Sequence, residues 1–177
     1  LYSNDEALPS IKRMIGSSTS ILTIQNGVTS GSIIAGYYGW DHVLQGATYI
    51  ESGIAGDGHI HQSGSTARIE FGEKDGSDSE RTTAILKLLD RKGIQAVVSS
   101  SMLDALWNKM VMVGAIGTIM AASRASLPEI LASPNGEQTI RSTMEEIVAV
   151  GQSQGITFPP RCVESKIEVA IAEAEEF

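Results

Sequence analysis

The chain has 177 residues, of which 42% are hydrophobic and 19% charged, and its formal net charge is −8. This length fits one domain, or one domain and part of a second, and the apolar fraction is sufficient for a core. An acidic chain binds nucleic acid and anionic membranes poorly, because both require a concentrated positive field, so we expect neither as a partner. The single cysteine, Cys162, excludes an internal disulfide framework and a cysteine-rich zinc site, and it fits a cytoplasmic protein.

The two ends of the sequence indicate a piece of a longer protein. The chain begins at Leu1 without an initiator Met or a signal-peptide pattern, and at Phe177 it stops within a helical pattern. We therefore expect further sequence on both sides.

The first part of the chain mixes helix and strand patterns. Capping-box spacing at Ser3 and Glu6 predicts a helix that Pro9 delays or bends. Residues 20–25 predict a short strand that ends at Asn26–Gly27.

The pattern of strands continues to about residue 99. Residues 43–50 form a second apolar stretch, and residues 59–61 and 66–71 predict two strands joined by a short loop through residues 62–64. A capping box at residues 77–80 predicts a helix that stops at Gly93, and one more strand is expected over residues 95–99.

From Ser101 onward the pattern is helical throughout. Residues 102–122 are apolar on nearly every face, which predicts a buried central helix. Its uncharged apolar run over residues 110–122 is shorter than the ~20 residues that a membrane span requires. Two amphipathic helices should follow, one between Asn135 and Gly155 and one after Pro159–Pro160. The fold class is therefore α/β followed by all-α, with a boundary near residues 99–101.

Lys109 is the most suggestive position for chemistry, because it is the only charged residue between Ala105 and Ser123. An ammonium group in an apolar helix must reach water or meet a partner, since burying it alone is costly. It is either a lysine whose stem packs while its head stays in water, or a lysine that faces a cleft and donates a proton.

Asn26–Gly27 follows the strand at residues 20–25, and ligands in open α/β sheets bind at the carboxyl ends of strands. Asn offers a donor and an acceptor, and Gly lets a ligand approach the backbone, but an ordinary turn has the same sequence. His59 and His61 are too few for a metal site, and we predict none. Cys162 begins a helix beside Arg161 and is expected to be structural.

Taken together, these residues resemble the ketopantoate reductase family. Residues 21–28 are similar to the family's strand ending in Asn-Gly. Residues 46–49, 58–61 and 67–72 are similar to its paired strands with a terminal Gly. Residues 106–110, which contain Trp107 and Lys109, match the helix that opens its helical domain.

The resemblance implies an NADPH-dependent reductase of a 2-keto acid. Residues 1–100 would be the latter part of a Rossmann-type NADP-binding domain, and residues 101–177 an incomplete helical domain that binds substrate and provides a homodimer contact. The family's Gly-rich phosphate turn and a later glutamate would lie outside the chain. Asn26 and Gly27 would contact the cofactor near the nicotinamide ribose, Ser52 would contact it elsewhere, and Lys109 would be the general acid.

The sequence departs from the family at three positions where polar substrate contacts are usual. Val113, Gly117 and Leu127 stand where the family has asparagines, so the substrate is expected to be larger or less hydroxylated than ketopantoate. Arg124 is the new charge nearby; it is either a clamp for a substrate carboxylate or a surface arginine. These departures also leave an alternative, in which the chain is a non-catalytic binding or oligomerisation module on the same fold.

Overall fold

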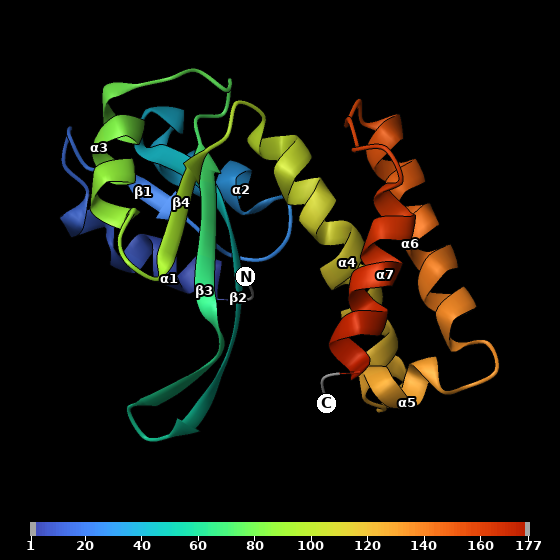
Figure 1. Cartoon of the computed structure of the whole chain (residues 1–177). Helices are drawn as coiled ribbons and strands as arrows, with labels where there is room; N and C mark the ends of the chain where they lie inside the picture. The colour runs from blue at the N-terminus through green and yellow to red at the C-terminus, as the bar shows by residue number, and fades with distance from the viewer. Residues whose placement is uncertain (1–2, 176–177) are drawn as a thin grey trace. The chain divides into compact units, whose positions relative to one another are not determined.

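The computed structural model describes residues 3–175, and it describes only the backbone of residues 64–66. The chain divides into two compact units, Leu1–Ala105 and Leu106–Phe177, and each is described by itself. The first unit holds a mixed sheet with helices, and the second is helical. The predicted order of an α/β part followed by an all-helical part is confirmed (Figure 1).

The sheet of the first unit has the order β1-β2-β3-β4. Its strands are β1 (Ile21–Thr23), β2 (Val43–Gly56), β3 (His59–Gly72) and β4 (Ile94–Val98). β1 and β2 are parallel, β2 and β3 are antiparallel, and β3 and β4 are parallel. Each parallel pair is joined by a crossover that contains a helix, α2 for the first pair and α3 for the second.

The helices of this unit are α1 (Asn4–Ser10), α2 (Ser30–Tyr38) and α3 (Glu80–Leu89), with 3-10 turns at Lys12–Met14 and Trp40–His42. α1 and α2 pack on one face of the sheet at β1 and β2. That core is formed by Leu8, Ile34 and Val43, with Ile11, Ile21, Ala35, Tyr38 and Trp40 packed against it.

The start of β2 is buried on both faces of the sheet. Val43 and Leu44 point to opposite faces, because side chains alternate along a strand, and both are 0% exposed. Val43 and Leu44 pair with Ile21 and Leu22 of β1, so this buried stretch lies directly beside β1.

The hairpin formed by β2 and β3 differs from the sequence prediction. We expected two strands at residues 59–61 and 66–71 with a loop between them; instead β3 is continuous, and the turn lies at Asp57–Gly58. The glycine and serines at residues 62–65 favour a loop locally, but pairing with β2 overrides this preference. A register shift after Tyr49 accommodates the extra residues. Figure 1 shows the tip of this hairpin projecting away from the remainder of the sheet.

The helix starts also differ in part from the prediction. Ser3 makes no side-chain cap at α1. α3 forms as predicted, but its capping box joins Ser79 and Thr82 rather than residues 77 and 80. α2 was not predicted, because Gly31 and Gly36 give its sequence little helical character.

An ion pair joins the start of α3 to the end of β3, and Arg81 also reaches the 3-10 turn before β2. Arg81 donates hydrogen bonds to Glu73 from Nε at 2.7 Å and from Nη2 at 2.5 Å, and to the backbone carbonyl of Trp40 at 3.3 Å. Ser79 Oγ also donates to Glu73 at 2.7 Å. These hydrogen bonds hold the pKa of Glu73 below its usual range, and those from Arg81 have the largest effect.

The second unit consists of helices around an apolar core. They are α4 (Met102–Ser123), which begins in the first unit, α5 (Leu127–Leu131), α6 (Gly136–Ser153) and α7 (Cys162–Glu175). α5 was not predicted. The core is formed by Val111, Ala115, Ile130, Ile140, Met144, Cys162, Val163 and Ile167.

α4 is less buried than its composition predicted. Val111 and Ala115 are fully buried, but Val113 is 40% exposed and Gly117 is also exposed. Within the described residues, α4 is one helix that is long and apolar enough to cross a membrane by length and composition alone. The expectation of a buried central helix therefore holds for one side of α4 only.

Candidate functional site

The turn after β1 carries the first group of predicted site residues. Asn26 follows the end of β1 by three residues, its side chain is exposed, and α2 begins at Ser30. Gly27 has φ of 99°, in the left-handed region that favours glycine. The structure thus places Asn26 and Gly27 between the carboxyl end of a parallel strand and the start of a helix, where α/β sheets bind ligands.

A hydrogen-bonded group of buried and half-buried polar side chains lies directly before this turn. Gln25 Nε2 donates to Asn4 Oδ1 at 3.0 Å, and Asn4 Nδ2 donates in return to Gln25 Oε1 at 3.5 Å. Thr23 Oγ1 also donates to Gln25 Oε1 at 3.5 Å. Sequence reasoning missed this group, because Asn4 and Gln25 are far apart in the chain and neither belongs to a motif.

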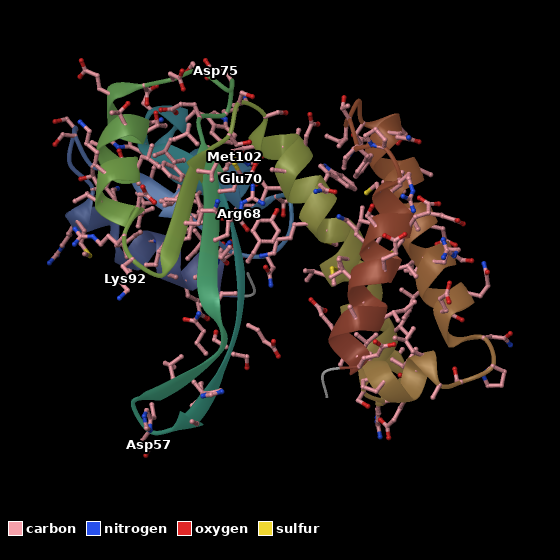
Figure 2. The ribbon with its side chains drawn as sticks, viewed as in Figure 1. Asp57, Arg68, Glu70, Asp75, Lys92 and Met102 are labelled. Carbon is pink, nitrogen blue, oxygen red and sulfur yellow. The ribbon has the colours of Figure 1, made fainter. Side chains whose placement is uncertain are left out.

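Ser52 lies farther from β1 than its predicted role suggests. Along β2, the last residue paired with β1 is Gln45, and at about 3.3 Å per residue Ser52 lies roughly 23 Å beyond it. Ser52 is exposed and faces Gln62 across the hairpin, whose tip carries Asp57 (Figure 2). The structure does not group Ser52 with the turn, and its cofactor contact stays a prediction.

A second polar group lies on β2 and β3. Arg68 Nη2 pairs with Glu70 Oε2 at 2.9 Å, and the Arg68 guanidinium lies 5.2 Å from the centre of the Tyr49 ring. Figure 2 shows Arg68 and Glu70 in succession along β3. Burial, and then the charge of Glu70, raise the pKa of Tyr49. Sequence reasoning also missed this group; alternation of Arg68 and Glu70 along a strand is the signal that predicts a shared face.

Lys109 lies on α4 in the second unit. Its side chain is half-buried, and this burial lowers the pKa of its ammonium group below the usual lysine value. The neighbouring residues hold the helix in place: a Cβ added at Gly151 would lie 3.1 Å from the Trp107 ring, and Asn108 Oδ1 accepts a hydrogen bond from Cys162 Sγ at 3.4 Å. A lysine with a lowered pKa on a fixed helix is suited to donate a proton.

An open line of small and apolar residues continues from Lys109 along α4. Val113 and Gly117 follow at steps of four residues, so the three positions lie on neighbouring parts of one helix face. A Cβ added at Gly117 would meet no atom within 4 Å. Leu127, the third departure from the family, is instead half-buried against the core of the second unit.

Arg124 lies in the turn between α4 and α5, with φ of 56° and an exposed side chain. At 1.5 Å per residue its backbone is about 22 Å from Lys109 along the helix direction. The structure therefore does not bring the backbones of Arg124 and Lys109 together. Its role as a carboxylate clamp stays a prediction.

Cys162 and the histidines add no catalytic group to these positions. Burial raises the pKa of the Cys162 thiol, which fits its expected structural role. His59 and His61 are exposed on the hairpin. Among residues 3–175, no cluster of three or more His, Cys, Asp or Glu is arranged to hold a metal ion.

The turn after β1 has features that fit the ribose of a nicotinamide cofactor. The exposed amide of Asn26 supplies a donor and an acceptor for hydroxyl groups, and the glycine conformation at Gly27 leaves room for close approach. The sequence contains no Gly-x-Gly-x-x-Gly, so these residues would hold only part of a dinucleotide.

Comparison with known proteins connects both units to one family. A sequence profile described as "Ketopantoate reductase PanE/ApbA" matches residues 1–76, and one described as "Ketopantoate reductase PanE/ApbA C terminal" matches residues 101–176. The two profiles together match most of the chain.

Among curated relatives, a 2-dehydropantoate 2-reductase of Streptococcus pyogenes serotype M3 is 26% identical over 151 residues, which is 85% of this chain and 49% of that protein. One from Mesorhizobium japonicum is 27% identical, over 89% of this chain and 54% of that protein. The chain thus spans about half the length of the curated relatives it matches.

Solved structures agree on the fold. The 2-dehydropantoate 2-reductase of Geobacter metallireducens GS-15 has a TM-score of 0.89 at 23% identity, over 97% of this chain and 57% of that chain. A PanE/ApbA family ketopantoate reductase from Ralstonia eutropha JMP134 has a TM-score of 0.84 at 19% identity, over 97% of this chain and 55% of that chain.

Proposed function

The chain belongs to the ketopantoate reductase family, and from this membership we propose that the full-length protein is an NADPH-dependent reductase of a 2-keto acid. The observation that carries the proposal is Lys109, a half-buried lysine with a lowered pKa within the part of the chain that matches the family's C-terminal profile. The product is the corresponding 2-hydroxy acid.

Residues 1–100 contribute to the NADP-binding domain, and Asn26 and Gly27 bind the nicotinamide ribose. The Asn26 amide hydrogen-bonds the ribose hydroxyls, and Gly27 lets the backbone approach them. Ser52 is proposed as a further cofactor contact from the hairpin. When bound, the cofactor supplies a hydride to the carbonyl carbon of the substrate.

Residues 101–177 contribute to the substrate domain, and Lys109 is the general acid. Its ammonium group hydrogen-bonds the carbonyl oxygen and gives it a proton as negative charge develops there. The neutral amine that remains takes a proton from water before the next turnover. Because burial lowers the pKa of Lys109, its ammonium gives up the proton more readily than that of an exposed lysine.

The substrate preference follows from the α4 face next to Lys109. Val113 offers an apolar surface and Gly117 open space, so neither can hydrogen-bond substrate hydroxyls. The preferred substrate therefore has a larger or less hydroxylated side chain than ketopantoate. We also propose that the protein acts in the cytoplasm and dimerises through its helical domain.

A steady-state panel tests this proposal. Purified full-length protein is assayed with NADPH and with NADH against ketopantoate and against 2-keto acids with aliphatic or aromatic side chains. We expect NADPH oxidation, with the highest kcat/KM on a less hydroxylated acid. If ketopantoate has the highest kcat/KM, the argument from Val113 and Gly117 is wrong; if no 2-keto acid is reduced, the proposed reaction is wrong.

A further inference from the structure

We propose that Gln25 is a positioning residue, which holds Asn26 in the orientation that receives the cofactor. The proposal rests on the proposed function, because it assumes that Asn26 binds the nicotinamide cofactor. Its basis is the hydrogen-bonded group of Asn4, Thr23 and Gln25 directly before the turn after β1.

The geometry of this group fixes the Gln25 amide. Gln25 and Asn4 exchange two hydrogen bonds, of 3.0 and 3.5 Å, so each amide is both donor and acceptor for the other. Thr23 adds a third bond to Gln25 Oε1 at 3.5 Å. Asn4 and Thr23 are each only 7% exposed. Because buried polar groups lose their water contacts, Asn4 and Thr23 depend on the half-buried Gln25 amide for these hydrogen bonds.

The fixed Gln25 side chain anchors the backbone from which Asn26 projects. Thr23 at the end of β1 and Gln25 two residues later both belong to the hydrogen-bonded group, and the chain bends at Asn26. Gln25 points toward Asn4 and Thr23, as their hydrogen bonds show, and the side chain of Asn26 is exposed. The hydrogen bonds of Gln25 therefore anchor the backbone directly before Asn26.

The other end of the turn is held by packing. A Cβ added at Gly31 would lie 2.5 Å from Gln45 Nε2, so the first turn of α2 sits directly against the buried Gln45 side chain. Gln45 pairs with Thr23 in the sheet register. Residues 26–30 therefore connect two anchored points, of which Gln25 is the one adjacent to Asn26.

The experiment measures the Kd of NADPH by calorimetric titration of full-length protein. The variants are Gln25→Ala, Asn26→Ala and the double variant, at a temperature where thermal melts show all of them folded. Gln138→Ala is the matched control, because Gln138 makes one exposed side-chain hydrogen bond, to Ser142 on α6. We expect Gln25→Ala to raise Kd about tenfold, which corresponds to the loss of one or two hydrogen bonds. Gln138→Ala should leave Kd unchanged.

The double variant separates positioning from mere stability. If Gln25 acts through Asn26, the double variant binds NADPH no more weakly than Asn26→Ala alone. A Gln25→Ala protein with lower Tm but unchanged Kd overturns the proposal and leaves the cofactor role of Asn26 intact. Equal weakening in both backgrounds also overturns it. An Asn26→Ala protein with unchanged Kd overturns the proposed function at this residue, and the positioning role with it.

A milder variant keeps the test valid if Gln25→Ala does not fold. Thr23→Val removes only the bond from Thr23 Oγ1 and keeps the shape of the side chain. We expect it to raise Kd about threefold, an effect that again disappears in the Asn26→Ala background. An unchanged Kd in a folded Thr23→Val protein then overturns the proposal.

Discussion

The two units support their proposed functional residues in opposite ways. In the first unit, Asn26 directly follows a group of hydrogen-bonded polar side chains. In the second, Lys109 belongs to a helix whose buried side is apolar. Among the described residues, the buried polar or charged side chains all lie in the first unit: Asn4, Thr23, Ser30, Gln45, Glu73 and Thr82.

This difference determines which property of each residue its surroundings control. A polar support fixes the direction of a side chain, because hydrogen bonds require defined angles. An apolar support leaves direction freer but removes water, which changes the pKa of a charged group. Asn26 should therefore respond to changes in its hydrogen-bonded neighbours, whereas Lys109 should respond to pH.

The largest expected effect is on catalysis in the second unit. Lys109→Ala should lower kcat by about 10²–10⁴-fold, the usual contribution of a general acid, with little loss of stability. The kcat is measured in steady state and the stability by thermal melting.

Lys166→Ala is the matched control for this change. Lys166 is also a half-buried lysine of the second unit whose pKa burial lowers, but it lies on α7. Its replacement should leave kcat unchanged. Wild-type turnover in Lys109→Ala would contradict the general-acid role.

The next largest effect concerns a buried polar contact of the first unit. Arg81→Ala leaves the Glu73 carboxylate without its main partner, and should lower the free energy of unfolding by about 2–3 kcal/mol. Arg141→Ala removes ion pairs with Glu137 on α6 and Glu164 on α7, both half-exposed carboxylates, and should cost less than about 1 kcal/mol. Urea denaturation measures both; equal losses would show that the buried polar contacts of the first unit matter no more than surface pairs.

The pH dependence of the reaction tests the effect of the apolar surroundings of Lys109. The ammonium form of Lys109 is the acid, so kcat/KM should fall about tenfold per pH unit above the pKa of Lys109. Because burial lowers that pKa, the fall should begin below the ordinary lysine value of about 10.4. Lys166→Ala should show the same profile. A rate that stays flat up to the ordinary value would contradict the effect of burial.

The smallest expected effect is on substrate choice. Gly117→Asn places an amide on the open α4 face, where an added Cβ meets no atom within 4 Å. It should raise kcat/KM for ketopantoate about five- to tenfold relative to an apolar 2-keto acid, roughly the value of one hydrogen bond. Thr118→Asn, at the adjacent exposed position, is the control. If Gly117→Asn leaves the ratio of the two kcat/KM values unchanged, this face of α4 does not contact the substrate.

The sequence predicted those parts of the fold that depend on local signals. α3, α4, α6 and α7 follow from capping and periodicity, and the position of Asn26 at a strand end follows from the Asn-Gly pair. The continuous β3 could not be predicted, because residues 62–65 favour a loop until β2 pairs with them. The contact of Gln25 with Asn4 was also out of reach, since it depends on how α1 packs beside β1.

The exposed side of α4 illustrates the same limit. An almost uniformly apolar sequence predicts burial on every face, yet Val113 and Gly117 remain open. Composition sets how much of a helix can be buried, and tertiary packing decides which side is.

The most direct test of the account follows the transferred hydrogen. Full-length protein is incubated with NADPH that carries deuterium at both C4 positions of the nicotinamide and with each 2-keto acid of the panel, and the products are analysed by mass spectrometry. We predict a 2-hydroxy acid with deuterium at C2, formed by the wild type and strongly reduced in Lys109→Ala. A folded protein that binds NADPH and forms no deuterated hydroxy acid from any substrate of the panel would contradict the account.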